Sequence, residues 1–425
     1  MRESLKERPG YEAGSREEVL VVGGPHSWEE AEGGSSSPLP ALEEAEDKGK
    51  GIMGVLSTVF AFKAHLTSIK DLDSRGSLLV TASTDETMRI YNLKTRCDSG
   101  MLTKHQGSVT CVRLSWNSRY LISCGEDKAV YIWRCVNWDP VKSFEGVHEA
   151  TPISADFHPS MKLALTLDID GNLCLLDLLK GALALRFAVP GVGKKGLSFN
   201  RRFGLFTSVR FSLSGTYYAV LSQREVVIAR LTDEGWSIGS SSTELGLGAA
   251  QITSFCWVSD EAFLVGFSNG ELRALRITRE ALRSIEVSFS MSGQSQSGAE
   301  NPHLGSRIKG ICTVGHAHTG ERGGASCSIR GRLVTCDSTG VFALFNLTLD
   351  PSHAAGSGRL MLEIVDVLDS DNRITCMVVE DKSPVDPLSL SGLEDPDPPA
   401  RDNKRPKVIK KGKSVGRTER NSSKQ

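Results

Sequence analysis

Short runs of alternating apolar and polar residues recur in the first half of the chain, in the same order each time. Residues 65–92 and 105–134 each open with a histidine, continue through an alternating run and turn at an aspartate, and each ends in a run closed by an aromatic residue. A third copy begins at His148 and turns at Asp170. Alternation with a period of two is typical of half-buried β-strands. The pattern therefore predicts repeated units built from strands.

The spacing of the copies identifies the kind of repeat. Both the histidines and the turn aspartates recur at intervals of about 40–45 residues. A period of that length that carries four short strands is typical of a β-propeller blade. A propeller is a platform for binding more often than a catalyst.

One strand type opens every predicted blade, and the chain offers seven such openings. We therefore predict an all-β, seven-bladed WD-repeat β-propeller over residues 55–380, with Gly/Ser-rich insertions at 290–303 and 315–326. The openings lie at residues 68–72, 110–114, 153–157, 207–211, 253–257, 308–312 and 374–378.

Closure of the ring requires strands from the N-terminus, because a proline-rich segment follows the seventh opening directly. Residues 1–50 are rich in Glu, Gly, Ser and Pro and are predicted to be mostly disordered. The β-prone run at 19–24 is the predicted closing strand. A second strand would have to come from residues 25–57, whose composition suits a strand poorly.

The C-terminal part is predicted to hold an acidic, proline-rich linker at 381–400 and a disordered basic tail at 401–425. The tail is of the nuclear-import or RNA-binding type. Any RNA contact made by it would depend strongly on salt. The residues that carry this prediction are Lys404, Arg405, Lys407, Lys410, Lys411 and Lys413.

The first three repeats carry histidine, hydroxyl, aspartate and aromatic residues in fixed order. A hydrolase triad is one interpretation of such residues, but three copies in one chain favour a structural network that joins loop, turn and strand in each blade. The third copy has Leu176 where the others have a ring, which predicts a weaker network there. The network residues are His65, Thr81, Asp85 and Tyr91, then His105, Ser123, Asp127 and Trp133, then His148, Thr166 and Asp170.

Other motifs give no chemistry. The GxGxxG match at 191–196 lacks a following helical pattern, and the pair His316 and His318 lies in a glycine-rich insertion, so both are predicted to be loops. The ten cysteines form no CxxC pair, which favours a reducing compartment, and no apolar run is long enough to span a membrane. The formal net charge of −1 gives the chain as a whole no polyanion affinity. We expect no catalytic, cofactor-binding or metal site and no enzymatic activity.

The chain resembles the p21-activated protein kinase-interacting protein 1-like family of WD-repeat proteins. The resemblance is carried by the runs HLTSIKDL (65–72), LLVTASTDETMRIYN (78–92), YLISCGEDKAVYIW (120–133), HPSMKLALTLDIDGNLCLLDL (158–178), SRIKGI (306–311) and NRITCM (372–377), and by the lysine-rich tail. It implies a non-catalytic scaffold in nucleolar assembly of the large (60S) ribosomal subunit, including pre-rRNA processing. The alternative is a signalling adaptor that binds and negatively regulates a p21-activated-type kinase.

The expected partners follow from this resemblance and from the tail. They are pre-ribosomal large-subunit proteins, pre-rRNA through the basic tail, and a protein kinase in the alternative function, with no membrane and with the chain as a monomer inside a larger assembly. The expected location is the nucleus and nucleolus. One face of the disc is predicted to present Lys63, Lys104, Asn137–Trp138 and Lys194–Lys195 as contacts.

Overall fold

The computed structural model describes most of the predicted repeat region. The described residues are 18–23, 56–63, 65–189, 204–232, 235–241, 250–278, 282–291, 300–319, 329–350, 358–370, 374 and 376–378. All of them lie within one compact unit, Met1–Pro387. Among these residues, no helix is long and apolar enough to cross a membrane.

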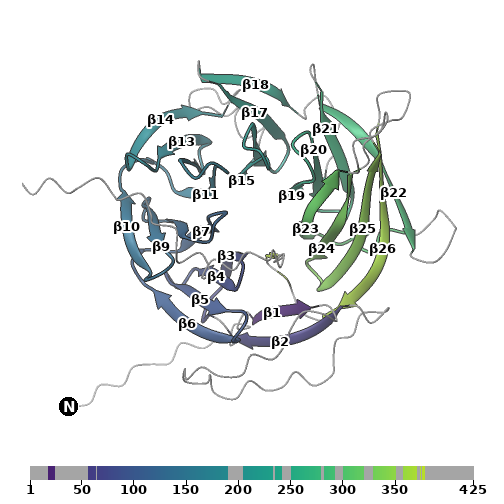
Figure 1. Ribbon diagram of the computed structural model, residues 1–425, viewed down its shortest axis with the longest axis horizontal. Coiled ribbons are helices and arrows are strands. Elements are labelled where there is room, and N and C mark those ends of the chain that lie inside the picture. The colour runs from purple at the N-terminus through teal and green to yellow at the C-terminus, as the bar shows by residue number, and fades with distance from the viewer. Residues whose placement is uncertain are drawn as a thin grey trace, which may run out of the picture. The chain divides into compact units, whose positions relative to one another are not determined.

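Successive antiparallel strands form four separate four-stranded sheets (Figure 1). The first two consist of β3 (Ile69–Arg75), β4 (Leu78–Ser83), β5 (Met88–Asn92) and β6 (Cys97–Leu102), and of β7 (Val109–Leu114), β8 (Tyr120–Gly125), β9 (Val130–Arg134) and β10 (Asp139–Phe144). The next two consist of β11 (Pro152–Phe157), β12 (Leu163–Asp168), β13 (Asn172–Asp177) and β14 (Ala182–Ala188), and of β15 (Phe206–Phe211), β16 (Tyr217–Ser222), β17 (Val226–Thr232) and β18 (Gly235–Ser241).

The fifth and sixth blades join into one eight-stranded sheet. They consist of β19 (Ile252–Trp257), β20 (Ala262–Phe267), β21 (Leu272–Ile277) and β22 (Leu282–Met291), and of β23 (Ile308–Thr319), β24 (Ile329–Asp337), β25 (Val341–Asp350) and β26 (Arg359–Asp369). Their outer strands, β22 and β26, pair in parallel over Glu286–Met291 and Arg359–Ile364.

The prediction of an all-β propeller is confirmed. Figure 1 shows the sheets following one another around a centre, with the first strand of each sheet innermost. Six of the seven predicted openings coincide with β3, β7, β11, β15, β19 and β23. The histidine pair at 316–318 was predicted to be a loop, but β23 continues through it, because its partner β24 extends equally far and His318 pairs with Arg330.

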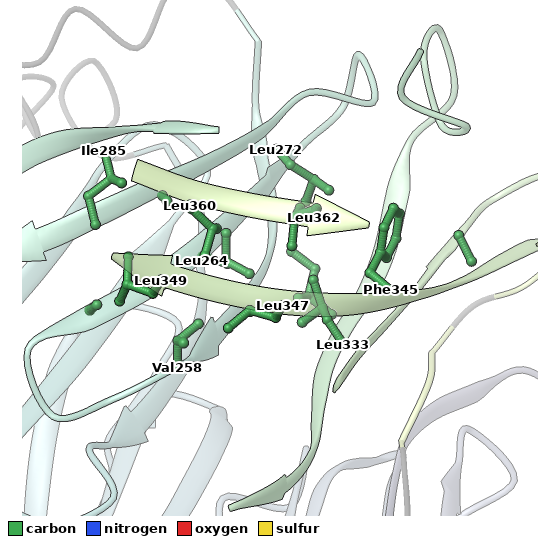
Figure 2. Packing of buried hydrophobic residues seen from close by; sticks show 14 of the residues in the cluster. Val258, Leu264, Leu272, Ile285, Leu333, Phe345, Leu347, Leu349, Leu360 and Leu362 are labelled. Carbon is green, nitrogen blue, oxygen red and sulfur yellow. The ribbon is translucent and has the colours of Figure 1, made fainter. Parts of the chain in front are cut away.

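Apolar side chains fill the space between the fifth and sixth blades (Figure 2). Phe345, Leu333 and Leu362 are fully buried there, and Leu264 reaches the same cluster from the neighbouring blade. Burial of such side chains stabilises a domain by about 1.5–3 kcal/mol each. The parallel pairing of β22 with β26 closes two outer edges that would otherwise present unpaired backbone groups.

The seventh opening, at 374–378, lies between the sixth and first blades, although its described residues form no strand. Ile374 and Met377 pack into a cluster with the sixth blade, and Cys376 and Val378 pack against the first blade. This segment therefore fills the gap between the two ends of the repeat region.

The N-terminal part of the chain forms a separate two-stranded sheet. β1 (Glu18–Gly23), which covers the predicted closing strand, pairs antiparallel with β2 (Ser57–Lys63). The expectation that a second strand would come from residues 25–57 was wrong, since the partner strand only begins at Ser57. Just before it, the amide of Leu56 donates to Oδ2 of Asp366 at 2.7 Å, so the N-terminal part is tied to β26.

Substitution Asp366→Ala is expected to lower the free energy of unfolding by about 2 kcal/mol, because it leaves the buried amide of Leu56 without this acceptor. Urea denaturation measures the change. Asp139→Ala, an exposed carboxylate at the start of β10, is the matched control and should shift stability by less than about 0.5 kcal/mol. Equal effects of the two substitutions would contradict a role for Asp366 in closure.

Candidate functional site: the inner wall and the two rims of the propeller

Side chains on the inner strand of one blade bind backbone amides of the next inner strand. Oδ2 of Asp71 accepts from the amide of Val112 at 3.1 Å, and Oδ2 of Asp73 accepts from the amide of Leu114 at 2.7 Å. Asp71 also accepts from the guanidinium of Arg113 at 2.8 Å. In both hydrogen bonds the donor amide lies 41 residues after the acceptor, so β3 and β7 run parallel and in register.

The same arrangement recurs further around the ring. Oγ of Ser154 accepts from the amide of Val209 at 3.1 Å, and Oδ2 of Asp156 accepts from the amide of Phe211 at 2.7 Å. Between these pairs, the amide of Ala155 donates to Sγ of Cys111 at 3.3 Å. The inner strands β3, β7, β11 and β15 therefore point the same way.

Parallel inner strands place equivalent turns at the same side of the propeller. In each antiparallel sheet, the turn between the second and third strands lies at the same end as the loop that leads to the next sheet. We call this end the histidine rim, because it carries His65, His105 and His148. The turns between the first and second strands, and between the third and fourth, form the opposite rim.

The second blade has the complete network. Nδ1 of His105 lies 2.9 Å from Oδ2 of Asp127, and Nε2 lies 2.8 Å from Oγ of Ser123. Nε1 of Trp133 donates to the same Oγ at 2.9 Å. An ionised carboxylate can only accept, so Nδ1 carries the proton and the hydroxyl of Ser123 donates to Nε2. Gly125 is required beside it, because a Cβ there would lie 2.4 Å from Nδ1 of His105.

The first blade repeats this arrangement without the indole. Nδ1 of His65 lies 2.9 Å from Oδ2 of Asp85, and Nε2 lies 2.7 Å from Oγ1 of Thr81. Thr87 donates to the other oxygen of Asp85 at 2.6 Å. Tyr91, which takes the place of Trp133, is buried in the cluster that faces the closing segment.

The third blade departs from the prediction in its carboxylate. Nε2 of His148 lies 2.7 Å from Oγ1 of Thr166, as the pattern predicts, but Nδ1 faces Asp168 at 3.3 Å. Asp170 was assigned to the network wrongly: it is exposed, and its amide donates to Asp168 at 3.0 Å. Without a ring at Leu176, the hydroxyl of Thr166 lies 3.3 Å from the carbonyl oxygen of Cys174.

A fourth network, in the sixth blade, was missed. Nδ1 of His303 lies 3.0 Å from Oδ2 of Asp337, and Nε2 lies close to Oγ1 of Thr335. Ser306 donates to the same carboxylate oxygen at 2.6 Å. The spacing of Thr335 and Asp337 matches that of Thr166 and Asp168, and this match is the signal that could have located it.

Burial and hydrogen bonding shift the pKa values of several groups in these networks. Desolvation lowers the pKa of His105 and of His65, although Asp127 and Asp85 oppose the shift. Desolvation alone would raise the pKa of Asp337, but hydrogen bonds from His303, Ser306 and Thr339 hold it well below its usual range. The same hydrogen-bonded arrangement of imidazole, hydroxyl and carboxyl groups recurs in four blades, and this repetition indicates a structural role.

The remaining predicted contacts divide between the two rims. Lys104 lies at the histidine rim, with Nζ 5.4 Å from the ring centre of Tyr131. Asn137–Trp138 lies in the third turn of the second blade, at the opposite rim, so the expectation of one shared face was wrong. Lys63 ends β2. Lys194–Lys195 and the GxGxxG match at 191–196 lie outside the described residues.

The predicted nuclear-targeting or RNA-binding residues, Lys404, Arg405, Lys407, Lys410, Lys411 and Lys413, also lie outside the described residues. Within the part of the chain that the structure describes, no group of three or more His, Cys, Asp or Glu side chains could hold a metal ion.

The family model for the WD domain, G-beta repeat, matches residues 56–92 and 97–134, the segments that contain the first two networks. A solved structure of U3-55K has a TM-score of 0.53 at 11% identity and covers 80% of this chain and 89% of that one. At this identity the likeness concerns the fold alone. The chain is a β-propeller whose first two blades match the WD-repeat family model.

Two curated relatives are p21-activated protein kinase-interacting protein 1-like proteins. The one from Xenopus laevis is 32% identical over 132 residues, which cover 31% of this chain and 36% of that protein. The one from Gallus gallus is 24% identical over 357 residues, which cover 84% of this chain and 82% of that protein. The resemblance of this chain to the p21-activated protein kinase-interacting protein 1-like proteins is thereby confirmed.

Substitution Ser123→Ala is expected to lower the free energy of unfolding by about 3 kcal/mol, because it removes the partner of both His105 and Trp133 in a buried site. Thr166→Val removes the corresponding hydroxyl where no ring donor is present, so its cost should be about half as large. Urea titrations of both variants make the comparison. Equal costs would contradict the contribution of the indole.

The inner wall predicts a pH effect at Asp156. Desolvation raises the pKa of this carboxyl to about 7, although the amide of Phe211 and the charge of Arg113 oppose the shift. In the unfolded chain its pKa is about 3.9. Between these values the folded state binds more protons than the unfolded state, so ionisation of Asp156 lowers stability as the pH rises.

Substitution Asp156→Asn keeps an acceptor for the amide of Phe211 and removes the charge. The variant should therefore gain stability relative to the wild type as the pH rises from about 4 to about 7. Urea unfolding at several pH values, expressed as the difference between the two proteins, cancels the contributions of the buried histidines. A difference that stays constant with pH would contradict the raised pKa.

Proposed function

We propose that this chain is a non-catalytic scaffold in nucleolar assembly of the large (60S) ribosomal subunit, including pre-rRNA processing. The observation that carries the proposal is the resemblance to the p21-activated protein kinase-interacting protein 1-like proteins, which extends over 84% of the chain in the Gallus gallus relative. Its partners are pre-ribosomal large-subunit proteins, and it acts as a monomer within a larger assembly without a membrane.

The architecture supports a scaffold. Four buried networks contain the histidine, hydroxyl and carboxylate groups that resemble a hydrolase triad. In these networks the groups hydrogen-bond to one another and hold loops to strands. The rigid disc that results presents turns on two rims, and such a surface suits simultaneous contact with several partners. We therefore expect the residues that contact partners to lie on the rims, where the networks hold them in position.

The basic tail supplies the proposed location. Lys404, Arg405, Lys407, Lys410, Lys411 and Lys413 direct the chain to the nucleus and nucleolus, and contact pre-rRNA there. The proposed domain plan keeps the boundaries of the sequence prediction: an N-terminal segment at 1–50, the propeller at 55–380, the acidic linker at 381–400 and the basic tail at 401–425.

A second candidate function is favoured by the names of the relatives. Those proteins are named for interaction with a p21-activated protein kinase. In this alternative the chain is a signalling adaptor that binds such a kinase through a rim and restrains it. Such an adaptor would not need to associate with large-subunit precursors.

Sedimentation of the native protein in cell extract on sucrose gradients, at low and then high salt, separates the two functions. The proposed function predicts co-migration with large-subunit precursors, and progressive release as the salt concentration rises. A full-length variant with the six tail residues replaced by Gln should be released at lower salt. Migration among small complexes at every salt concentration would contradict the assembly function and favour the kinase adaptor.

A further inference from the structure

The two rims of the first three blades carry opposite charge. Between the strands of these blades, the described turns of the opposite rim contain five basic residues and no acidic residue, and two carboxylates, Asp139 and Asp177, stand at strand ends beside these turns. The basic residues are Lys94, Arg96, Arg119, Lys162 and Lys180. The described turns and loops at the histidine rim, between the first strand and the last strand of these three blades, contain seven acidic residues and two lysines. They are Asp85, Glu86, Glu126, Asp127, Glu145, Glu149 and Asp170, with Lys104 and Lys128.

The fold accounts for only part of this segregation. Asp85 and Asp127 serve the histidine networks, but Lys94, Arg96 and Lys162 are exposed turn residues on the other side. Exposed charges of this kind contribute little to stability. Charges of one sign gathered on one face create a field that attracts a partner of the opposite sign. The opposite rim is therefore suited to a polyanion.

An aromatic side chain lies within this basic surface. The guanidinium carbon of Arg75, at the end of β3, lies 4.4 Å from the ring centre of Trp116 in the first turn of the second blade. Trp116 remains 36% exposed. Stacking on exposed aromatic and guanidinium planes, together with Lys and Arg contacts to phosphate, is the way proteins bind single-stranded nucleic acid.

We propose that the opposite rim of the first three blades binds single-stranded RNA, with Lys94, Arg96 and Lys162 at the phosphates and the Arg75–Trp116 pair beneath a base. The choice of RNA among polyanions rests on the proposed function, since a pre-ribosome supplies RNA. The acidic histidine rim repels the same ligand. The first three blades therefore meet RNA on one side only, and their other side remains available to protein.

The test is fluorescence anisotropy of a labelled single-stranded RNA oligonucleotide of mixed sequence, titrated with the full-length protein over a range of salt concentrations. The variant Lys94→Glu with Lys162→Glu changes the opposite rim. The matched control, Lys104→Glu with Lys128→Glu, makes the identical change of net charge on the histidine rim. Thermal melting of both variants confirms that these exposed substitutions leave the fold intact.

The opposite-rim variant should weaken binding by about tenfold, and the slope of log affinity against log salt should fall by about 1.4, because two phosphate contacts are lost. The control should retain wild-type affinity to within about twofold. Equal losses in both variants, or no loss in either, would overturn the proposal. The basic tail is present in both proteins, and repeating the titrations in a background with the six tail residues replaced by Gln removes its contribution.

Trp116→Ala tests the single-stranded part of the proposal. It should weaken binding by about fivefold or more while the salt slope stays unchanged, because stacking releases no counterions. An unchanged affinity would overturn the assignment of a stacked base. This experiment is independent of gradient sedimentation. A protein that binds RNA through the opposite rim but never co-migrates with precursors would disprove the proposed function alone, and the reverse result would disprove the RNA surface alone.

Discussion

The acceptor that one inner strand offers to an amide of the next inner strand is the interaction on which the rest of the structure depends. Asp73 binds the amide of Leu114, and Asp156 binds the amide of Phe211, each at 2.7 Å. These bonds fix neighbouring blades parallel and in register. Because of that register, equivalent turns meet at the same rim, and residues far apart in sequence form a continuous surface.

The histidine networks all lie at one rim of this arrangement of blades, where they hold loops to strands. Each of the four joins a loop that enters a blade to a strand hydroxyl and to a carboxylate in the following turn or at the end of that strand. Buried polar groups are stable only when they are hydrogen-bonded, so a complete network fixes one loop geometry. One rim of the propeller is consequently shaped by buried bonds, whereas the exposed basic turns of the opposite rim are left to contact a partner.

The strands could be predicted from sequence because the alternating pattern survives in every blade, even across insertions. The partner of His148 could not, since spacing alone aligns Asp170 with Asp127, whereas the side chain in contact is Asp168. His303 was missed because it was assigned to the insertion at 290–303, of which it is the last residue. β2 was missed because a second closing strand was expected from residues 25–57, whereas β2 runs from Ser57 to Lys63 and pairs with β1, which lies far away in sequence. The opposed charges of the rims become visible only once strand order assigns each turn to a side.

The central claim is that the opposite rim binds RNA and that the histidine rim is left to protein partners. Ultraviolet crosslinking of native particles, followed by mass spectrometry of the crosslinked peptides, tests it most directly. The account predicts RNA crosslinks in the turns that contain Lys94, Trp116 and Lys162, and none in the described loops of the histidine rim in the first three blades. RNA crosslinks confined to the histidine rim would contradict it.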